Sequence, residues 1–112
     1  MGHTQCGGVA GCHAMCSGQA PELEEDTSFV GRWMDILRPG FERAVKSSEK
    51  EEEQVKELER QSVLVSLENL MTFPFVRERV EAEDLTLHGI SVNNKSGELS
   101  HYDPALKQLV EI

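Results

Sequence analysis

Apolar side chains recur every three to four residues in the first half of the chain, a spacing that places them on one face of a helix. The positions are Val30, Trp33, Leu37, Phe41 and Ala44. Pro39 and Gly40 interrupt the run, so we expect a kink or two short helices there. Asp26, Thr27 or Ser28 can cap the first of them. Because an aromatic residue at helical spacing generally packs inside, Trp33 is interpreted as a core residue and not as a stacking surface for a ligand.

A polar run gives way to an apolar face between residues 47 and 71. Residues 47–59 are dense in Glu and Lys, which is typical of the solvated face of a helix. Apolar positions then take over, so residues 61–71 are predicted to be the better buried half. Pro74 closes this helix and favours the start of a short one. In that short helix Phe75, Val76 and Val80 are expected to face inward.

The last third of the chain carries the pattern of β-strands. Residues 85–92 alternate and are rich in β-forming side chains, and residues 98–102 form a shorter segment of the same kind. A cluster of turn residues at 93–97 separates them and predicts a hairpin. His88 lies inside the first strand and is interpreted as structural, with a proton-shuttle role as the alternative; His101 is expected to be exposed and inert. Asp103 and Pro104 are expected to start a terminal helical turn.

Composition limits the possible partners. The chain has 112 residues, is 38% apolar and carries a net charge of −9, with no cluster of Lys and Arg. One domain of this charge favours neither nucleic acid nor an anionic membrane as a partner. No apolar run is long enough for a membrane span, and no signal peptide is visible. Three cysteines without an export signal predict reduced thiols and a cytoplasmic location.

The candidate chemistry lies at the N-terminus. His3 and Cys6 stand three residues apart, followed by Gly7 and Gly8 and then by a small-residue run that predicts a helix ending near residues 17–18. Imidazole nitrogen and thiolate sulfur are ligands that Zn²⁺ accepts in a tetrahedron. A helical turn would place both side chains on one side, and the start of a helix favours the thiolate. The two glycines would let a small substrate approach the metal closely.

The other two cysteines do not complete this site. On one continuous helix Cys12 and Cys16 would lie roughly 9 Å and 15 Å along the axis from Cys6 at 1.5 Å per residue. Sulfur ligands of one zinc ion lie within about 4 Å of one another. His13 and Cys16 repeat the spacing of His3 and Cys6, but inside a helix they are interpreted as packing residues.

The sequence Gly2-His3-Thr4-Gln5-Cys6-Gly7-Gly8-Val9 resembles the second zinc motif of the β-class carbonic anhydrases. Three later segments resemble that family in the same order, and the likeness covers nearly the whole chain except the acidic stretch around residues 49–56. These segments are Asn69 to Arg77, Leu87 to Gly89, and Gly97 to Asp103. The resemblance implies a zinc ion held by two cysteines and a histidine, with His3 and Cys6 matching the histidine and the second cysteine.

The resemblance also implies a fold and an assembly. Residues 1–112 would be the C-terminal part of an α/β β-carbonic anhydrase domain, with helices packed on a mainly parallel sheet that ends in a hairpin. A homodimer or a higher homo-oligomer is expected. The family's other motif, Cys-x-Asp-x-Arg, supplies the first cysteine ligand and an Asp/Arg pair that orients the zinc-bound solvent, and no such string occurs in this sequence. We therefore expect a C-terminal half that lacks the catalytic Asp/Arg pair.

Three functions follow as hypotheses. The first is reversible hydration of carbon dioxide to bicarbonate and a proton, with the chain alone binding zinc weakly and catalysing poorly. The second is a non-catalytic remnant that binds zinc weakly or docks onto a full-length relative. The third, a thiol redox protein using Cys12 and Cys16, is disfavoured because their spacing is not the Cys-x-x-Cys arrangement of reactive thiols.

Overall fold

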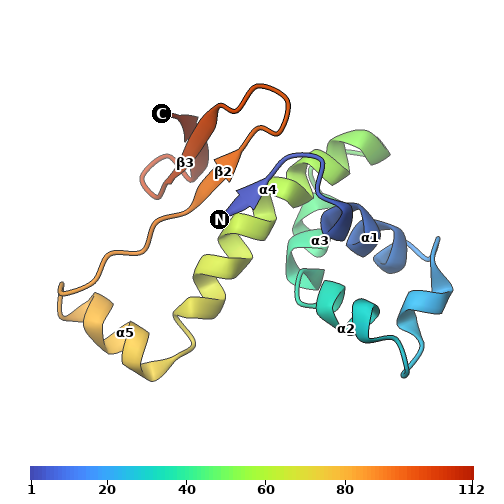
Figure 1. Ribbon diagram of the computed structural model, residues 1–112, viewed down its shortest axis with the longest axis horizontal. Helices are drawn as coiled ribbons and strands as arrows, with labels where there is room; N and C mark the ends of the chain where they lie inside the picture. The colour runs from blue at the N-terminus through green and yellow to red at the C-terminus, as the bar shows by residue number, and fades with distance from the viewer.

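The computed structural model describes residues 1–112 and contains five α-helices, one 3₁₀ helix and one four-stranded sheet. The helices are α1 (Gly7–Cys16), η1 (Pro21–Glu24), α2 (Phe29–Asp35), α3 (Arg38–Ala44), α4 (Glu51–Leu70) and α5 (Pro74–Glu81). The strands are β1 (Gly2–His3), β2 (Ile90–Val92), β3 (Leu99–Asp103) and β4 (Gln108–Glu111). Helix α4 runs through the middle, with α1 to α3 on one side and the sheet on the other (Figure 1). None of the helices combines the length and the apolar character needed to cross a bilayer.

Helices α1 to α3 begin and end close to where the sequence predicted. Helix α1 ends at Cys16, and Gly18 follows with a φ of +82° that reverses the chain. The Ser28 hydroxyl accepts a hydrogen bond from the Gly31 N–H (3.0 Å) and so caps α2. The prediction of two short helices is also confirmed, with Pro39 in the first turn of α3. The proline therefore starts the second helix of the pair and does not kink a longer one.

The core lies where α1, α3 and α4 meet. Val9, Cys12, Ala44 and Leu58 are buried there in one cluster. Helix α3 approaches α4 closely because Gly40 has no side chain: a Cβ at this position would lie only 3.1 Å from Leu58 Cδ1. The predicted burial of the second half of α4 is confirmed for Val63 and Val65, whereas its last turn is exposed at Leu70.

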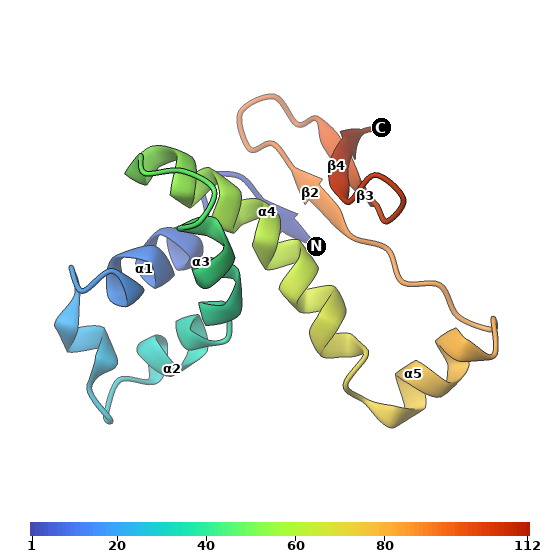
Figure 2. The same ribbon diagram turned by 180° about the vertical axis from the view of Figure 1, so that it is seen from behind.

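Two aromatic predictions are wrong. Trp33 is 64% exposed, and Phe75 is 66% exposed beside Phe73 on α5. Helix α2 has apolar residues around more than one face, so the core covers only part of them. Helix α5 stands apart from the cluster of α1 to α3 in both views, which leaves Phe75 in solvent while Val76 is buried (Figures 1 and 2).

The sheet has the order β1-β2-β3-β4. Strand β1 pairs in parallel with β2, so that Gly2 lies opposite Ser91 and His3 opposite Val92. The other two pairings are antiparallel. The predicted α/β fold with a C-terminal hairpin is thus confirmed, and the parallel arrangement is represented in this chain by the single pair β1 and β2.

The first predicted strand is shorter than expected, since residues 85–89 are not part of β2. Strand β1 has only two residues, and they pair with Ser91 and Val92 at the end of this segment. The chain nevertheless packs tightly at Gly89, which is buried against α4; a Cβ there would lie 2.6 Å from Val63 Cγ1. His88, outside the strand, is exposed, and its ring lies 5.8 Å from that of the half-buried His101.

The predicted terminal helical turn is wrong, because residues 108–111 form strand β4. Asp103 Oδ1 accepts hydrogen bonds from the N–H groups of Ala105 (2.9 Å) and Leu106 (3.4 Å), which closes a turn. Lys107 then adopts a φ of +55° and sends the chain back along β3. An Asp-Pro pair can start a helix or a turn, and here the unpaired edge of β3 decides the outcome.

Candidate metal centre

His3 is held at the end of β1 by contacts with the hairpin. The Thr4 N–H donates to the Val92 carbonyl (2.9 Å) and continues the parallel ladder for one residue. The His3 Nδ1 atom lies 2.9 Å from the Thr4 carbonyl oxygen and 2.9 Å from Asn94 Nδ2. Both partners lie on the Nδ1 edge of the ring, and Nε2 has no hydrogen-bond partner within the chain. Of the two nitrogens, Nε2 is therefore the one available to a ligand.

Cys6 stands at the start of α1 as its N-cap residue, and its carbonyl accepts a hydrogen bond from the Ala10 N–H (3.0 Å). Its thiol is half-buried and free. Between His3 and Cys6 the backbone reverses at Gln5, which has a φ of +54°. The Gln5 N–H donates to Glu59 Oε1 of α4 (2.9 Å), and this bond holds the reversal in place.

The predicted helical turn between His3 and Cys6 is therefore wrong: a strand end, a left-handed residue and an N-cap follow one another. Both residues nevertheless line the same cavity of about 340 Å³. The cavity lies between the end of β1, the first turn of α1 and helix α2. This position, beyond the carboxyl end of a parallel strand, is where open α/β sheets usually bind ligands.

The rest of this cavity, the His3–Cys6 cavity, is mostly apolar. It is lined by Met1, Gly2, His3, Cys6, Gly8, Val9, Trp33, Met34, Ile36, Leu37, Ser62 and Ser66. A Cβ at Gly8 would lie 3.5 Å from the Trp33 ring and 3.7 Å from Cys6 Sγ, whereas one at Gly7 would meet nothing within 4 Å. Gly8 thus borders the cysteine sulfur, and Gly7 faces open space. Sequence reasoning missed Trp33 as a cavity residue, although the excess of apolar residues on α2 was the available signal.

Two donors do not complete a zinc site, and the chain brings no third donor to them. No group of three or more His, Cys, Asp or Glu side chains is arranged to hold a metal ion. His13 is buried, and its Nε2 lies 2.9 Å from Gln54 Oε1. Cys12 and Cys16 lie 3.9 Å apart between their sulfur atoms on α1. The interpretation of His13 and Cys16 as packing residues agrees with their positions on α1.

The chemistry of Cys12 and Cys16 also disfavours a reactive thiol pair. Burial, with a further contribution from Cys16, raises the pKa of Cys12 to about 12. Burial likewise raises the pKa of Cys16. Both groups therefore stay protonated at neutral pH, and a protonated thiol is a poor nucleophile and a poor metal ligand.

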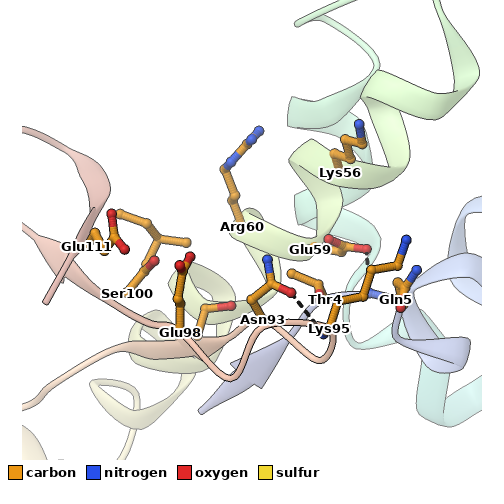
Figure 3. A pocket seen from close by; sticks show the side chains of 12 residues that line it. Thr4, Gln5, Lys56, Glu59, Arg60, Asn93, Lys95, Glu98, Ser100 and Glu111 are labelled. Atoms are coloured by element: carbon orange, nitrogen blue, oxygen red, sulfur yellow. Dashed lines mark hydrogen bonds between the residues drawn. The ribbon is translucent and has the colours of Figure 1, made fainter.

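A second cavity, of about 450 Å³, adjoins the other side chains of the same loop (Figure 3). Thr4 and Gln5 line it together with three cationic and three acidic residues from α4, the turn between β2 and β3, and β4. The charged residues are Lys56, Arg60, Lys95, Glu59, Glu98 and Glu111. The two signs balance in number, so the charged residues that line this cavity have a formal charge of zero. The loop thus separates a polar cavity from an apolar one that holds the metal-binding residue types.

Comparison with known proteins gives one consistent result. A family model described as carbonic anhydrase matches residues 1–99. Beta carbonic anhydrase 3 of Arabidopsis thaliana is 36% identical over 106 residues, which is 92% of this chain and 36% of that protein. The chloroplastic beta carbonic anhydrase 5 of the same plant is 33% identical over 92 residues, covering 80% of this chain and 29% of that protein.

The fold agrees with the sequence likeness. The solved structure of the β-carbonic anhydrase CcaA superposes with a TM-score of 0.78 at 26% identity, over 98% of this chain and 52% of that chain. This chain spans about a third of the length of the curated relatives it matches and about half of that solved structure.

Proposed function

Because this chain belongs to the β-carbonic anhydrase family, we propose that it supplies part of a zinc centre for the reversible hydration of carbon dioxide to bicarbonate and a proton. His3, through Nε2, and Cys6, through its sulfur, are the two ligands that this chain contributes. The observation that carries the proposal is that both residues line one cavity at the end of a parallel strand.

The pair fits zinc in donor type and in surroundings. Histidine ligands of zinc commonly donate the other ring nitrogen to a carbonyl, and His3 Nδ1 lies at hydrogen-bond distance from the Thr4 carbonyl. Four donors are needed for a tetrahedron, so two must come from outside these 112 residues, from another polypeptide segment or from solvent. A chain with two donors binds zinc weakly when it is alone.

The chain's own residues would shape the approach of the substrate. A zinc ion in such a site supplies water that is activated near neutral pH and can add to carbon dioxide. Val9, Trp33 and Leu37 give the cavity apolar walls, which suit a substrate without a net dipole and keep other water away. No catalytic acid or base is assigned to this chain.

Metal binding by the purified chain tests the proposal. We expect weak zinc uptake, measured by competition with a chromogenic chelator, and at least a tenfold loss of affinity in His3→Ala and in Cys6→Ser. His101→Ala and Cys16→Ala serve as matched controls and should leave the affinity unchanged. Stopped-flow hydration of carbon dioxide should be slow for the chain alone. Zinc uptake that is indifferent to replacement of His3 or Cys6 would overturn the proposal.

A second candidate function is docking onto another polypeptide of the family. Strand β1 is an edge strand of the sheet. Helix α2 exposes Phe29 and Trp33, its C-cap residue Ile36 is exposed as well, and Trp33 and Ile36 line the His3–Cys6 cavity. An open strand edge next to an apolar surface is typical of an interface. Co-purification with a full-length relative, with light scattering to count subunits, distinguishes the two candidates. A chain that binds no zinc but associates through this surface supports docking alone, and self-association would support the homodimer.

A further inference from the structure

His88 and His101 lie side by side on the hairpin, away from the residues that line the His3–Cys6 cavity. Their ring centres are 5.8 Å apart, and the two ring planes are inclined by 42°. His101 belongs to β3, and His88 belongs to the segment that leads into β2. The hydrogen bonds and the ion pair that histidine rings make in this protein all involve His3 or His13. The rings of His88 and His101 are therefore free to bind a ligand.

The pairing of β2 with β3 places the two histidines on one face of the hairpin. Ile90 lies directly opposite His101. The Tyr102 N–H donates to the Gly89 carbonyl (2.8 Å), which continues the pairing one residue toward His88. Because side chains alternate between the two faces along an extended segment, His88 lies on the face that carries Ile90 and His101.

This face points away from helix α4. Gly89 lies on the opposite face, where an added Cβ would be 2.6 Å from Val63 Cγ1 of α4 and 3.3 Å from Tyr102 Cβ. The neighbouring residues His88 and His101 alternate with Gly89 and Tyr102 and so face outward. His88 is exposed there, and His101 is half-buried. A dissolved ion can therefore reach both rings.

The distance between the rings suits one divalent transition-metal ion. Two nitrogen donors at about 2.0–2.1 Å from an ion lie about 3.4 Å apart at a tetrahedral angle and about 3 Å apart at a right angle. Ring centres 5.8 Å apart leave a similar space between two nitrogens that are turned toward each other. The exposed ring of His88 can make this turn because no hydrogen bond holds it, and exposed side chains change rotamer rapidly.

We propose that His88 and His101 form a separate metal site, a two-histidine chelate for Ni²⁺ or Cu²⁺ whose remaining coordination positions are filled by water. Imidazole suits both ions, and a nitrogen site binds Cu²⁺ most tightly among the divalent first-row metals. Zinc gains more from a thiolate such as that of Cys6, which this pair lacks. Asp103 does not join the pair, because its Oδ1 accepts the N–H group of Ala105 (2.9 Å) in the following turn. The site does not depend on the role of His3.

Calorimetric titration with Ni²⁺ tests the proposal. Ni²⁺ is the probe because, unlike Cu²⁺, it does not oxidise the free thiols. The full chain carries His3→Ala throughout, so that the His3–Cys6 pair does not contribute. We expect one Ni²⁺ per chain and a loss of about 100-fold in affinity when His88→Ala or His101→Ala is added, because a chelate becomes a single donor. Thr86→Ala, on the same exposed segment, is the matched control and should leave the affinity unchanged.

Two further measurements locate the ion and guard against a folding defect. In NMR spectra, substoichiometric Ni²⁺ should broaden the ring signals of His88 and His101 together and leave that of His13 sharp. Ni²⁺ should also raise the urea unfolding midpoint, and His88→Ala, which changes only an exposed side chain, should abolish this increase. An unchanged affinity in His88→Ala overturns the proposal, as does broadening of only one of the two ring signals.

The zinc experiments on His3 and Cys6 are independent of this result. A chain that takes up no zinc at that pair but binds Ni²⁺ through His88 and His101 would contradict the proposed function and support the separate site.

Discussion

His13 of α1 and Gln54 of α4 are joined by a hydrogen bond of 2.9 Å between Nε2 and Oε1, and this bond ties the two helices together inside the protein. The Gln54 amide nitrogen in turn donates to the Ser48 carbonyl (2.8 Å), so both ends of its side chain are used. His13 itself is 3% exposed and packs edge-on against Phe41. His13, the histidine of the chain's second His-x-x-Cys motif, therefore belongs to the packing between helices.

Replacement of Gln54 by Leu should destabilise the fold by about 1–3 kcal/mol, because it leaves the buried His13 N–H without an acceptor. Urea unfolding followed by circular dichroism measures the change. Glu51→Gln is the control: this exposed carboxylate lies 4.0 Å from His13 Nδ1, and its loss should cost less than about 1 kcal/mol. Equal urea unfolding midpoints for the two variants would show that the hydrogen bond between His13 and Gln54 does not stabilise the fold more than the exposed Glu51 does.

A larger side chain at Gly8 should shield Cys6, because a Cβ there points between the Trp33 ring and Cys6 Sγ. We expect Gly8→Leu to slow alkylation of Cys6 by iodoacetamide several-fold in the metal-free chain. Gly7→Leu, next to it but facing open space, should leave the rate unchanged. Mass spectrometry of the Cys6 peptide gives the rate. Similar rates in both variants would mean that the sulfur is reached from another direction.

The raised pKa of Cys12 should make the protein less stable at alkaline pH. Burial, aided by Cys16, raises this pKa from 9.0 to about 12, so between these values the unfolded chain loses a proton that the folded chain keeps. The contribution of Cys12 is therefore fully present below about pH 9 and declines as pH rises, by at most about 1.4 kcal/mol per pH unit. Urea unfolding at a series of pH values should show a flatter decline for Cys12→Ala. Parallel declines would contradict this origin.

Gly89 should be intolerant of a side chain because it passes directly over α4. An added Cβ would lie 2.6 Å from Val63 Cγ1 and 3.0 Å from Leu67 Cδ1. We expect Gly89→Ala to cost about 1–3 kcal/mol of unfolding free energy through overpacking. Gly7→Ala, in a helix and in open space, should be neutral or slightly stabilising. A Gly89→Ala variant as stable as Gly7→Ala would mean that the sheet can move away from the helix at no cost.

Local signals predicted most of the helices and the hairpin. Gly18, Ser28, Pro39 and Pro74 act within one or two turns of the chain, so their effects on helix ends depend little on distant residues. The type of the last element depended on distant residues. Asp103 and Pro104 suit either a helix or a turn, and the free edge of β3 selected the strand.

The candidate site divides in the same way. The sequence by itself determined the residue types, an imidazole and a thiol three residues apart before a glycine pair, because metal affinity follows from the chemistry of the donors. It also determined that Cys12 and Cys16 cannot join them, since the rise of a helix fixes their separation. The exposure of Trp33 could not be predicted from the local sequence, because the side of a helix that is buried depends on the elements that pack against it.

Only the tertiary structure decided how His3 and Cys6 come together. Both residues line one cavity because the chain reverses at Gln5 after the end of β1, and the hydrogen bond from Gln5 to Glu59 holds this reversal in place. The predicted helical turn does not form. The partner of the His3 ring comes from Asn94, ninety-one residues away. A contact over that separation exists only after β1 has paired with β2, because that pairing brings the hairpin turn to the end of β1.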